Sequence, residues 1–302
     1  MGEETVSSIR RYYDQQTGEI PSGTGLAWYL GRDQLHPSMV DDERIWNSQR
    51  GWLEGAKQTV KDLIKRLGIK KEHLVLDVGS GIGGVGRIVA EETGARVIEL
   101  NISRIQLATS KMLSHVDLNA EYGRIKHLQA NGLDMPIKAG SVDRIISVNM
   151  FYHFSNLKNA IRECSRVLKR GGKAGIDDWF LTQGATSGVQ DRLRIEWSSP
   201  EGFHRYDELV NECKQACLKI VEEVDLTEAG KKFINQDYFG KAFDRDVTPA
   251  VIDNFARIYR YEGYQPEHSK QAADELKNAV MFMGDLYRSG DAVYKQLVVE
   301  KE

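Results

Sequence analysis

The sequence predicts an α/β protein built on a doubly wound parallel sheet. From residue 73 onward, short apolar runs that are typical of buried strands alternate with segments of helical periodicity, which is the pattern expected when helices connect parallel strands. The chain has 302 residues, of which 41% are hydrophobic, so a large core can form without disulfides or a structural metal. No internal repeat or low-complexity tract interrupts this pattern.

The elements can be placed in order along the chain. Strands are expected at residues 73–78, 95–101, 125–129, 143–149, 172–178, 218–226 and 292–299. Helices are expected at residues 49–67, 84–93, 103–118 and 155–169. The helix at 49–67 is predicted by apolar residues that share one helical face, namely Trp52, Ala56, Val60, Ile64 and Leu67. The stretch of about sixty residues after Thr227 is too long for a plain connection between strands, so it indicates a mostly helical cap.

The first strand ends in a turn that suits a ligand. Asp77 is followed by Gly79, Gly81 and Gly83, with Ser80 between the first two glycines. Glycine permits positive φ and lets backbone N–H groups approach a ligand closely, and the helix that follows points its N-terminus at the same place. The turn therefore predicts a site for a nucleoside-bearing cofactor.

The glycines alone do not decide which cofactor binds. Residues 81–86 also satisfy the dinucleotide pattern Gly-x-Gly-x-x-Gly, and Glu99 follows Gly79 by twenty residues, as a ribose-binding acid would. Asp77 argues against a dinucleotide, because a carboxylate beside the turn repels a pyrophosphate but can bind an ammonium directly or through water. S-Adenosylmethionine contains such an ammonium, and we therefore favour it over NAD.

Further motifs follow in the order seen in a known family. Residues 131–137 read Asn-Gly-Leu-Asp-Met-Pro-Ile, residues 140–143 read Gly-Ser-Val-Asp, residues 166–172 read Arg-Val-Leu-Lys-Arg-Gly-Gly, and residues 12–14 read Tyr-Tyr-Asp. Together with the Asp-x-Gly-x-Gly-x-Gly turn, they resemble the class I S-adenosylmethionine-dependent methyltransferases. The resemblance is to the small-molecule group, which includes sterol, tocopherol and natural-product enzymes of the methyltransferase type 11-like kind. Arg170 stands where proline is commoner in that family.

The resemblance implies a Rossmann-like sheet of seven strands in the order 3-2-1-4-5-7-6, with the seventh strand antiparallel between the fifth and the sixth. It implies S-adenosyl-L-methionine as the cofactor and a division of the chain into four parts. These parts are residues 1–70 as an N-terminal helical lid or substrate segment, 71–226 as the cofactor-binding core, 227–290 as the cap and 291–302 as the final core strand.

Most expected cofactor contacts lie at the ends of strands. The resembled family usually has an acid for the ribose at the end of the second strand, but here Asn101 stands at that place, with Glu99 two residues earlier on the same face. We favour Asn101 and Gln106; the alternatives are Glu99, or asparagines that only cap turns. The expected cofactor-binding residues are Tyr12, Asp77, Gly79, Ser80, Gly81, Asn101, Ile102, Gln106, Asn131, Gly132, Leu133 and Asn149.

Three residues are expected to take part in catalysis. Methyl transfer from a sulfonium is an in-line displacement that depends on alignment, and a hydroxyl or protonated amine acceptor also needs a base. His153 follows the fourth strand at the ligand edge, and histidine has a suitable reference pKa; alternatively it is a helix-entry residue bonded to backbone. Asp178 ends the fifth strand, where it either orients an amine or solvates a loop. Tyr13 can close over the cofactor as a lid or serve as a core anchor.

These features predict methyl transfer to an O, N or nucleophilic C atom of a hydrophobic or aromatic small molecule in secondary metabolism. Many relatives have Glu-Ser-x-x-His where this chain has Asn149, Met150 and then His153. The missing carboxylate weakens C-methylation of a prenyl substrate, which needs a base to quench a carbocation. It leaves open a protein of the same fold that binds S-adenosylmethionine but catalyses a non-methylating reaction such as cyclisation.

Composition limits the expected partners. Lys+Arg 41 against Asp+Glu 44 gives a net charge of −3, without the basic stretch expected of a protein that binds DNA or RNA. Cys164, Cys213 and Cys217 are not clustered with histidines, so neither a metal nor a disulfide is expected. No apolar run is long enough for a membrane span and no signal peptide is recognisable. We therefore expect a cytoplasmic enzyme with a small-molecule substrate, and a homo-oligomer is left open.

Overall fold

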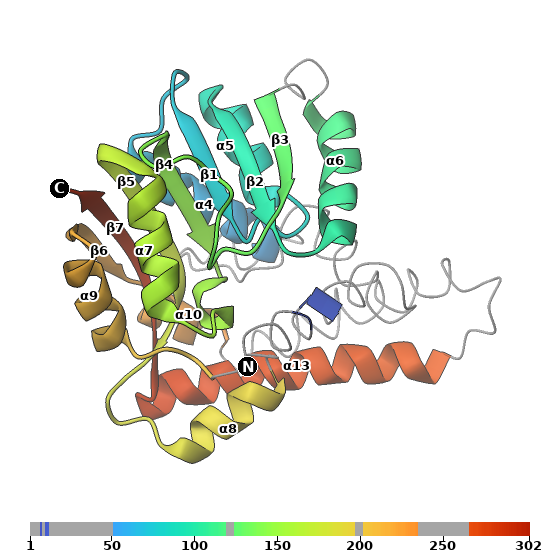
Figure 1. The fold of residues 1–302 in the computed structure, drawn as a ribbon. Coiled ribbons are helices and arrows are strands. Elements are labelled where there is room, and N and C mark those ends of the chain that lie inside the picture. Colours follow the sequence, from blue (N-terminus) through green and yellow to red (C-terminus); the bar gives the residue numbers. More distant parts are fainter. Residues whose placement is uncertain (1–6, 8–9, 12–50, 119–123, 197–201, 235–265) are drawn as a thin grey trace.

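The computed structural model describes residues 7, 10–11, 51–118, 124–196, 202–234 and 266–302. Within these residues, seven strands form one sheet in the order β3-β2-β1-β4-β5-β7-β6 (Figure 1). The strands β1 to β5 are parallel to one another, while β7 is antiparallel to both β5 and β6. The predicted fold class and strand order are confirmed.

The strand bounds agree with the predicted ones to within one residue at most ends. The strands are β1 (Leu74–Val78), β2 (Arg96–Asn101), β3 (Ile125–Gln129), β4 (Val142–Val148), β5 (Leu168–Leu181), β6 (Leu218–Asp225) and β7 (Ala292–Lys301). β5 differs most, because it begins at Leu168 and not at residue 172. It begins early since Leu168 pairs with Val142 before a register shift, and it continues to Leu181 because its last residues pair with the start of β7.

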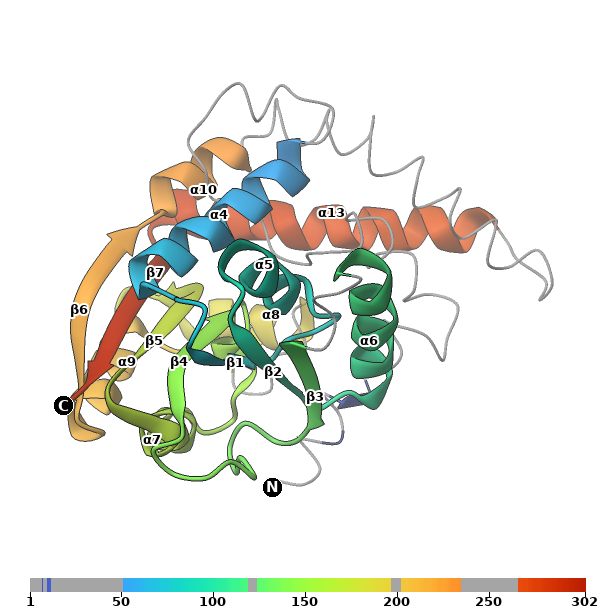
Figure 2. The same ribbon diagram turned by 90° about the horizontal axis from the view of Figure 1, so that it is seen from above.

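Helices cover both faces of the sheet. α4 (Gly51–Leu67), α5 (Gly84–Thr93) and α6 (Arg104–Leu118) lie on one face, and α7 (Leu157–Val167) and α9 (Tyr206–Gln215) lie on the other (Figure 2). Because neighbouring residues of a strand point to opposite faces, Val75 packs with α4 and α5 whereas Leu76 packs with α7 and α9. Both layers are apolar, as expected for a parallel sheet buried on both sides.

Two of these helices begin at the carboxyl edge of the sheet. α5 starts directly after the glycine turn and ends at Gly94, whose φ of 68° is the left-handed conformation in which helices often end. α7 starts after Asn156, whose side chain accepts a hydrogen bond from the backbone N–H of Asn159. Since each helix follows a parallel strand, both N-termini face the edge where ligands bind in such folds.

A further group of helices packs at this carboxyl edge. α8 (Ser187–Glu196), α10 (Thr227–Phe233) and α13 (Pro266–Ser289) lie there against the ends of β5 and β7 (Figure 1). Their shared core includes Trp179, Phe203, Tyr287 and Tyr294, which we call the aromatic cluster. α10 and α13 fall inside the predicted cap, whose residues 235–265 lie outside the described residues. The boundaries of the four predicted parts of the chain stay predictions. In the described part of the chain, no helix is long and apolar enough to cross a membrane.

Candidate functional site

The glycine turn after β1 has the backbone conformation that the sequence predicts. Gly79, Gly81 and Gly83 have φ angles of 77°, 55° and 80°, which residues with a Cβ rarely adopt. A Cβ on Gly79 would lie 2.0 Å from Met150 Cγ, whereas a Cβ on Gly81 would meet no described atom within 4 Å. Met150 therefore closes one side of the turn, and the turn is open at Gly81 as far as the described residues show.

Asp77 is buried at the end of β1 with part of its hydrogen-bonding capacity unused. It is 1% exposed, and its Oδ2, like the Oγ of Ser80, has no partner among the described residues. Burial, and then the charge of Glu99, raises the pKa of Asp77 well above its usual range, although the N–H of Gly86 and the charge of Arg87 oppose the shift. A buried carboxyl with a raised pKa beside an open turn is typical of a binding site.

The end of β2 joins the glycine turn to α6. Asn101 Nδ2 donates to the carbonyl of Gly81 at 3.1 Å and to Gln106 Oε1 at 2.8 Å, and Asn101 Oδ1 accepts from the N–H of Ser103 at 3.1 Å. Ile102 lies between β2 and α6, two residues before α6 begins at Arg104. Gln106 is buried, and its Nε2 has no partner in the part of the chain that the structure describes. This amide is a donor available to a ligand.

Glu99 faces the protein and not the open side of the turn. Ser110 Oγ donates to Glu99 Oε2 at 2.5 Å, and His127 Nε2 lies 3.3 Å from the same oxygen. A Cβ on Gly86 would lie 2.5 Å from Glu99 Oε1, so α5 packs directly on this carboxyl. Burial raises the pKa of Glu99 to about 7. Glu99 is therefore used inside the protein, between α5 and the side chains of Ser110 and His127.

The turn at residues 131–133 forms the other end of the site. Asn131 Oδ1 accepts a hydrogen bond from the N–H of Leu133 at 3.0 Å, which is the turn-capping role considered as an alternative. A Cβ on Gly132 would lie 2.8 Å from the ring of Phe154. The absence of a Cβ at Gly132 thus allows the ring of Phe154 to pack directly against this turn.

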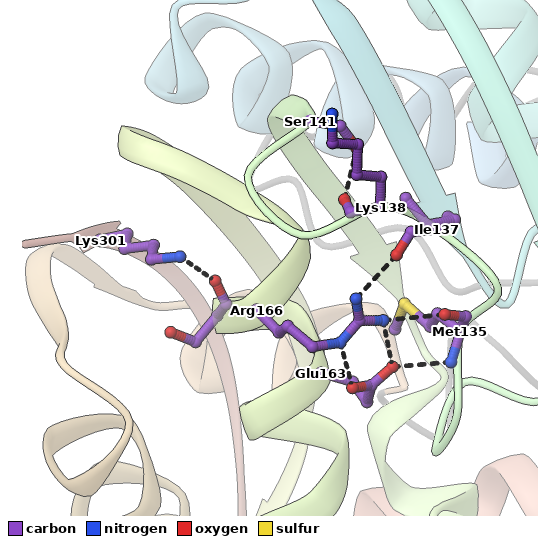
Figure 3. Close-up of polar contacts among 8 residues, drawn as sticks. Met135, Ile137, Lys138, Ser141, Glu163, Arg166 and Lys301 are labelled. Carbon is purple, nitrogen blue, oxygen red and sulfur yellow. Dashed lines mark hydrogen bonds and ion pairs between the residues drawn. The ribbon is translucent and has the colours of Figure 1, made fainter.

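An ion pair between Glu163 and Arg166 holds the chain just after this turn. Arg166 Nη1 donates to the carbonyl of Ile137 at 2.7 Å, and its Nη2 donates to the carbonyl of Met135 at 2.8 Å (Figure 3). Glu163 accepts from the N–H of Met135 at 2.7 Å and from Arg166 Nε at 2.6 Å. Figure 3 shows the guanidinium between the Glu163 carboxylate and the two carbonyls. One pair of side chains on α7 therefore holds both backbone groups of Met135.

Asn149 ends β4 in an unusual conformation. Its φ of 50° lies in the left-handed region, which non-glycine residues adopt rarely and mostly at functional sites or turns. Tyr294 donates its hydroxyl to Asn149 Oδ1 at 2.8 Å, and Asn149 Nδ2 has no partner among the described residues. The amide is therefore held from β7 and presents one N–H₂ group.

The catalytic candidates differ in how they are placed. His153 is buried in the short 3-10 helix η3 (Phe151–His153), with its ring 4.1 Å from that of Tyr152. Asp178 is also buried, but its carboxylate accepts backbone N–H groups, among them that of Trp179 at 2.8 Å; burial raises its pKa to about 8. This is neither of the roles expected for Asp178. Tyr12 and Tyr13 lie outside the described residues.

Comparison with known proteins agrees with this arrangement. The model of the family described as Methyltransferase domain matches residues 76–176. Sterol 24-C-methyltransferase erg-4 of Neurospora crassa is 26% identical over 292 residues, covering 90% of this chain and 73% of its own length. The sarcosine/dimethylglycine N-methyltransferase of Halorhodospira halochloris is 27% identical over 213 residues, covering 67% and 71%. Against two other fungal sterol 24-C-methyltransferases, the match spans 44% and 45% of the relative.

Solved structures share the fold. The [4+2]-cyclase SpnF has a TM-score of 0.71 at 18% identity, with 97% of this chain and 95% of that chain covered. Geranyl diphosphate C-methyltransferase of Streptomyces coelicolor A3(2), in complex with Mg2+, geranyl diphosphate and S-adenosyl-L-homocysteine, has a TM-score of 0.69 at 17% identity, with 100% of this chain and 99% of that chain covered. At these identities the likenesses show the fold, and the family match lies over the core of that fold.

Residues 76–176 form a methyltransferase domain of the class I S-adenosylmethionine-dependent kind.

The unused polar atoms around the turn fit the cofactor of a methyltransferase. Asp77 Oδ2 has the acceptor character that an ammonium requires, and Gln106 Nε2 has the donor character that a ribose hydroxyl requires. Among the described residues, nothing lies within 4 Å of a Cβ placed on Gly81. No group of three or more histidine, cysteine, aspartate or glutamate side chains that could hold a metal ion occurs among the residues that the structure describes. The polar groups around the turn match S-adenosylmethionine.

Sequence reasoning missed several residues that shape the methyltransferase site. Met150 contacts Gly79 of the glycine turn, and Tyr294 on β7 bonds to Asn149. No local sequence pattern predicts such contacts between distant elements. Arg166 was visible as part of a motif, and Glu163 precedes it by three residues, which is the spacing of side-chain pairs on a helix. That pairing is the signal that would have identified the anchor of the 131–137 region.

Proposed function

We propose that this methyltransferase transfers the methyl group of S-adenosylmethionine to an O, N or nucleophilic C atom of a hydrophobic or aromatic small molecule. The observation that carries the proposal is the aromatic cluster at the carboxyl edge, where Tyr294 bonds to Asn149 at the end of β4. Tyr152 lies beside His153 and has its ring centroid 5.9 Å from that of Trp179 and 4.6 Å from that of Phe203. Such rings favour a flat or apolar acceptor over a strongly charged one.

Each cofactor contact is assigned to a group of this chain. Asp77 would accept the ammonium, Asn101 would orient Gln106 toward the ribose, and the 131–133 turn would face the adenine. When bound, the cofactor supplies an electrophilic methyl group on a sulfonium. The protein's contribution is then to hold that methyl group in line with the acceptor and to exclude water.

His153 is the proposed base when the acceptor carries a proton. It follows β4 at the ligand edge, and its backbone N–H donates to the carbonyl of Met150 at 3.0 Å, which fixes the backbone at this position. Asn149, held by Tyr294, is proposed to orient the acceptor or the cofactor with its free amide. Tyr12 and Tyr13 remain proposed lid residues.

The test is direct. Purified protein is titrated with S-adenosylmethionine and S-adenosylhomocysteine by calorimetry, and is then incubated with methyl-labelled cofactor and separate pools of phenols, amines and prenyl alcohols. We expect binding, labelled product and one S-adenosylhomocysteine per product, and an Asp77→Asn variant that binds weakly. Failure of the wild-type protein to bind either cofactor form would refute the proposal.

A second function is kept because of one residue. Asn149 stands where a carboxylate base is common, and the [4+2]-cyclase SpnF shares this fold. We therefore also propose, as the alternative, a non-methylating reaction such as cyclisation at the same site, with C-methylation of a prenyl substrate disfavoured for lack of that base. Turnover of a substrate without formation of S-adenosylhomocysteine would support the alternative and contradict the main proposal.

Two finer statements accompany the proposal. We place the enzyme in the cytoplasm, which fractionation of the source cells tests. We leave a homo-oligomer open, and light scattering of the purified protein decides it.

A further inference from the structure

One buried carboxylate fixes the segment that lies between the parts of the site. Asp178 Oδ2 accepts hydrogen bonds from the N–H of Met150 at 3.0 Å and of Phe151 at 2.6 Å, and Asp178 Oδ1 accepts from the N–H of Trp179 at 2.8 Å. The first N–H groups of a helix have no carbonyl partner within it, and Met150 provides no side-chain cap for η3. Asp178 thus caps η3 from a neighbouring strand.

The capped segment touches three parts of the site. At one end the side chain of Met150 packs against Gly79, and at the other the ring of Phe154 packs against Gly132. Between them Tyr152 packs in the aromatic cluster. The segment therefore spans from the glycine turn to the 131–133 turn, and through Tyr152 it also contacts the aromatic cluster that we propose lies against the acceptor.

We propose that Asp178 is a positioning residue that sets the spacing between the glycine turn and the 131–133 turn, and thereby the affinity for the cofactor, without touching the cofactor. The physical reason is that two N–H groups on adjacent residues converge on one oxygen, which leaves the segment little freedom to slide. Packing then transmits that position to both turns, because glycine at each contact lets the side chain approach to van der Waals distance. The inference rests on the proposed placement of the cofactor between these turns.

A matched control lies at the opposite edge of the sheet. Asp143 Oδ2 accepts the N–H of Leu74 at 2.9 Å, and Asp143 Oδ1 accepts from Lys169 Nζ at 2.7 Å. This carboxylate also caps a backbone N–H on a neighbouring strand, but at the amino ends of the parallel strands, away from the site. A purely structural role of Asp178 predicts similar consequences for both aspartates.

The experiment compares Asp178→Ala and Asp178→Asn with Asp143→Ala and Asp143→Asn in the full chain. Calorimetry gives the Kd for S-adenosylhomocysteine, and urea unfolding gives stability. We expect Asp178→Ala to weaken binding by about tenfold or more, and Asp178→Asn to weaken it less, since an amide oxygen can still accept the N–H groups of Met150 and Phe151. The Asp143 variants should bind within about twofold of wild type, as expected of sites that do not communicate.

Met150→Ala provides a second route that leaves Asp178 intact. It removes the side chain that packs against Gly79, so weaker binding of S-adenosylhomocysteine is expected here too. If folded Asp178→Asn and Met150→Ala both bind like wild type, or if the Asp178 and Asp143 variants lose affinity equally, the inference is wrong. Failure of the wild-type protein itself to bind would instead refute the proposed function.

Discussion

Replacing Glu99 by glutamine should change how the stability of the protein depends on pH. Glu99 is fully buried beneath α5, and burial raises its pKa to about 7 from an ordinary value of 4.5. Between these two pH values the folded state holds a proton that the unfolded state has lost, so stability is greatest below pH 4.5 and falls as pH rises toward 7. Glutamine resembles the protonated acid in shape and has no proton to lose.

The magnitude follows from the pKa difference. Each unit corresponds to about 1.4 kcal/mol, so the shift corresponds to about 3 kcal/mol, most of which, about 2 to 3 kcal/mol, is expressed between pH 5 and pH 8. The free energy of unfolding of Glu99→Gln, relative to wild type, should therefore rise by that amount across this interval. The bond from Ser110 Oγ can be kept by the amide oxygen, so the two proteins should be similar near pH 5.

Urea unfolding monitored by circular dichroism at pH 5, 6, 7 and 8, at constant ionic strength, measures this difference. Glu228→Gln on α10 is the control, because Glu228 is exposed and paired only with Lys231 in the described structure. It removes one negative charge without removing a buried one. If the curves for wild type and Glu99→Gln run parallel from pH 5 to pH 8, Glu99 does not hold its proton as the structure indicates.

Three further predictions concern the site. His153→Gln should lower kcat by about 100-fold with little change in cofactor Kd; kinetics and calorimetry separate the two, and an equal loss of both would argue against a base. Arg166→Ala should cost about 2 kcal/mol of stability, because two carbonyls next to the 131–133 turn lose their donor. It should also weaken binding of S-adenosylhomocysteine more than binding of S-inosylhomocysteine, which lacks the adenine amino group. Equal weakening of binding for both ligands would argue against a role at the adenine. Gly79→Ala should destabilise by about 2 kcal/mol or more through its clash with Met150, and adding Met150→Ala should restore part of that loss in urea unfolding, whereas strictly additive effects would contradict the contact.

Several features of the site were predictable because they depend on neighbours in the chain. The turn after β1 follows from glycines at alternate positions, since only glycine adopts those positive φ angles without strain. Asn101 was a candidate because it stands where the resembled family has its ribose-binding acid, and Glu99 because it follows Gly79 by twenty residues and lies on the same face of the strand as Asn101. Strand periodicity does not show how deeply each side chain is buried. In the structure, α5 packs on Glu99, whereas Asn101 bonds to the carbonyl of Gly81 in the glycine turn.

Other features depend on residues far apart in the sequence. The sequence predicted that Asp178 ends a strand at the ligand edge, but not that its carboxylate turns toward the N–H groups of Met150 and Phe151.

The sequence by itself determined the order of strands and helices, the turn that holds a ligand and the edge of the sheet where it lies, because periodicity and glycine content act over a few residues. Only the tertiary structure decided which polar groups remain unsatisfied at that edge and which are used to hold it together. Hydrogen bonds between strands and packing across glycines are set by the positions of whole elements, which no local pattern encodes.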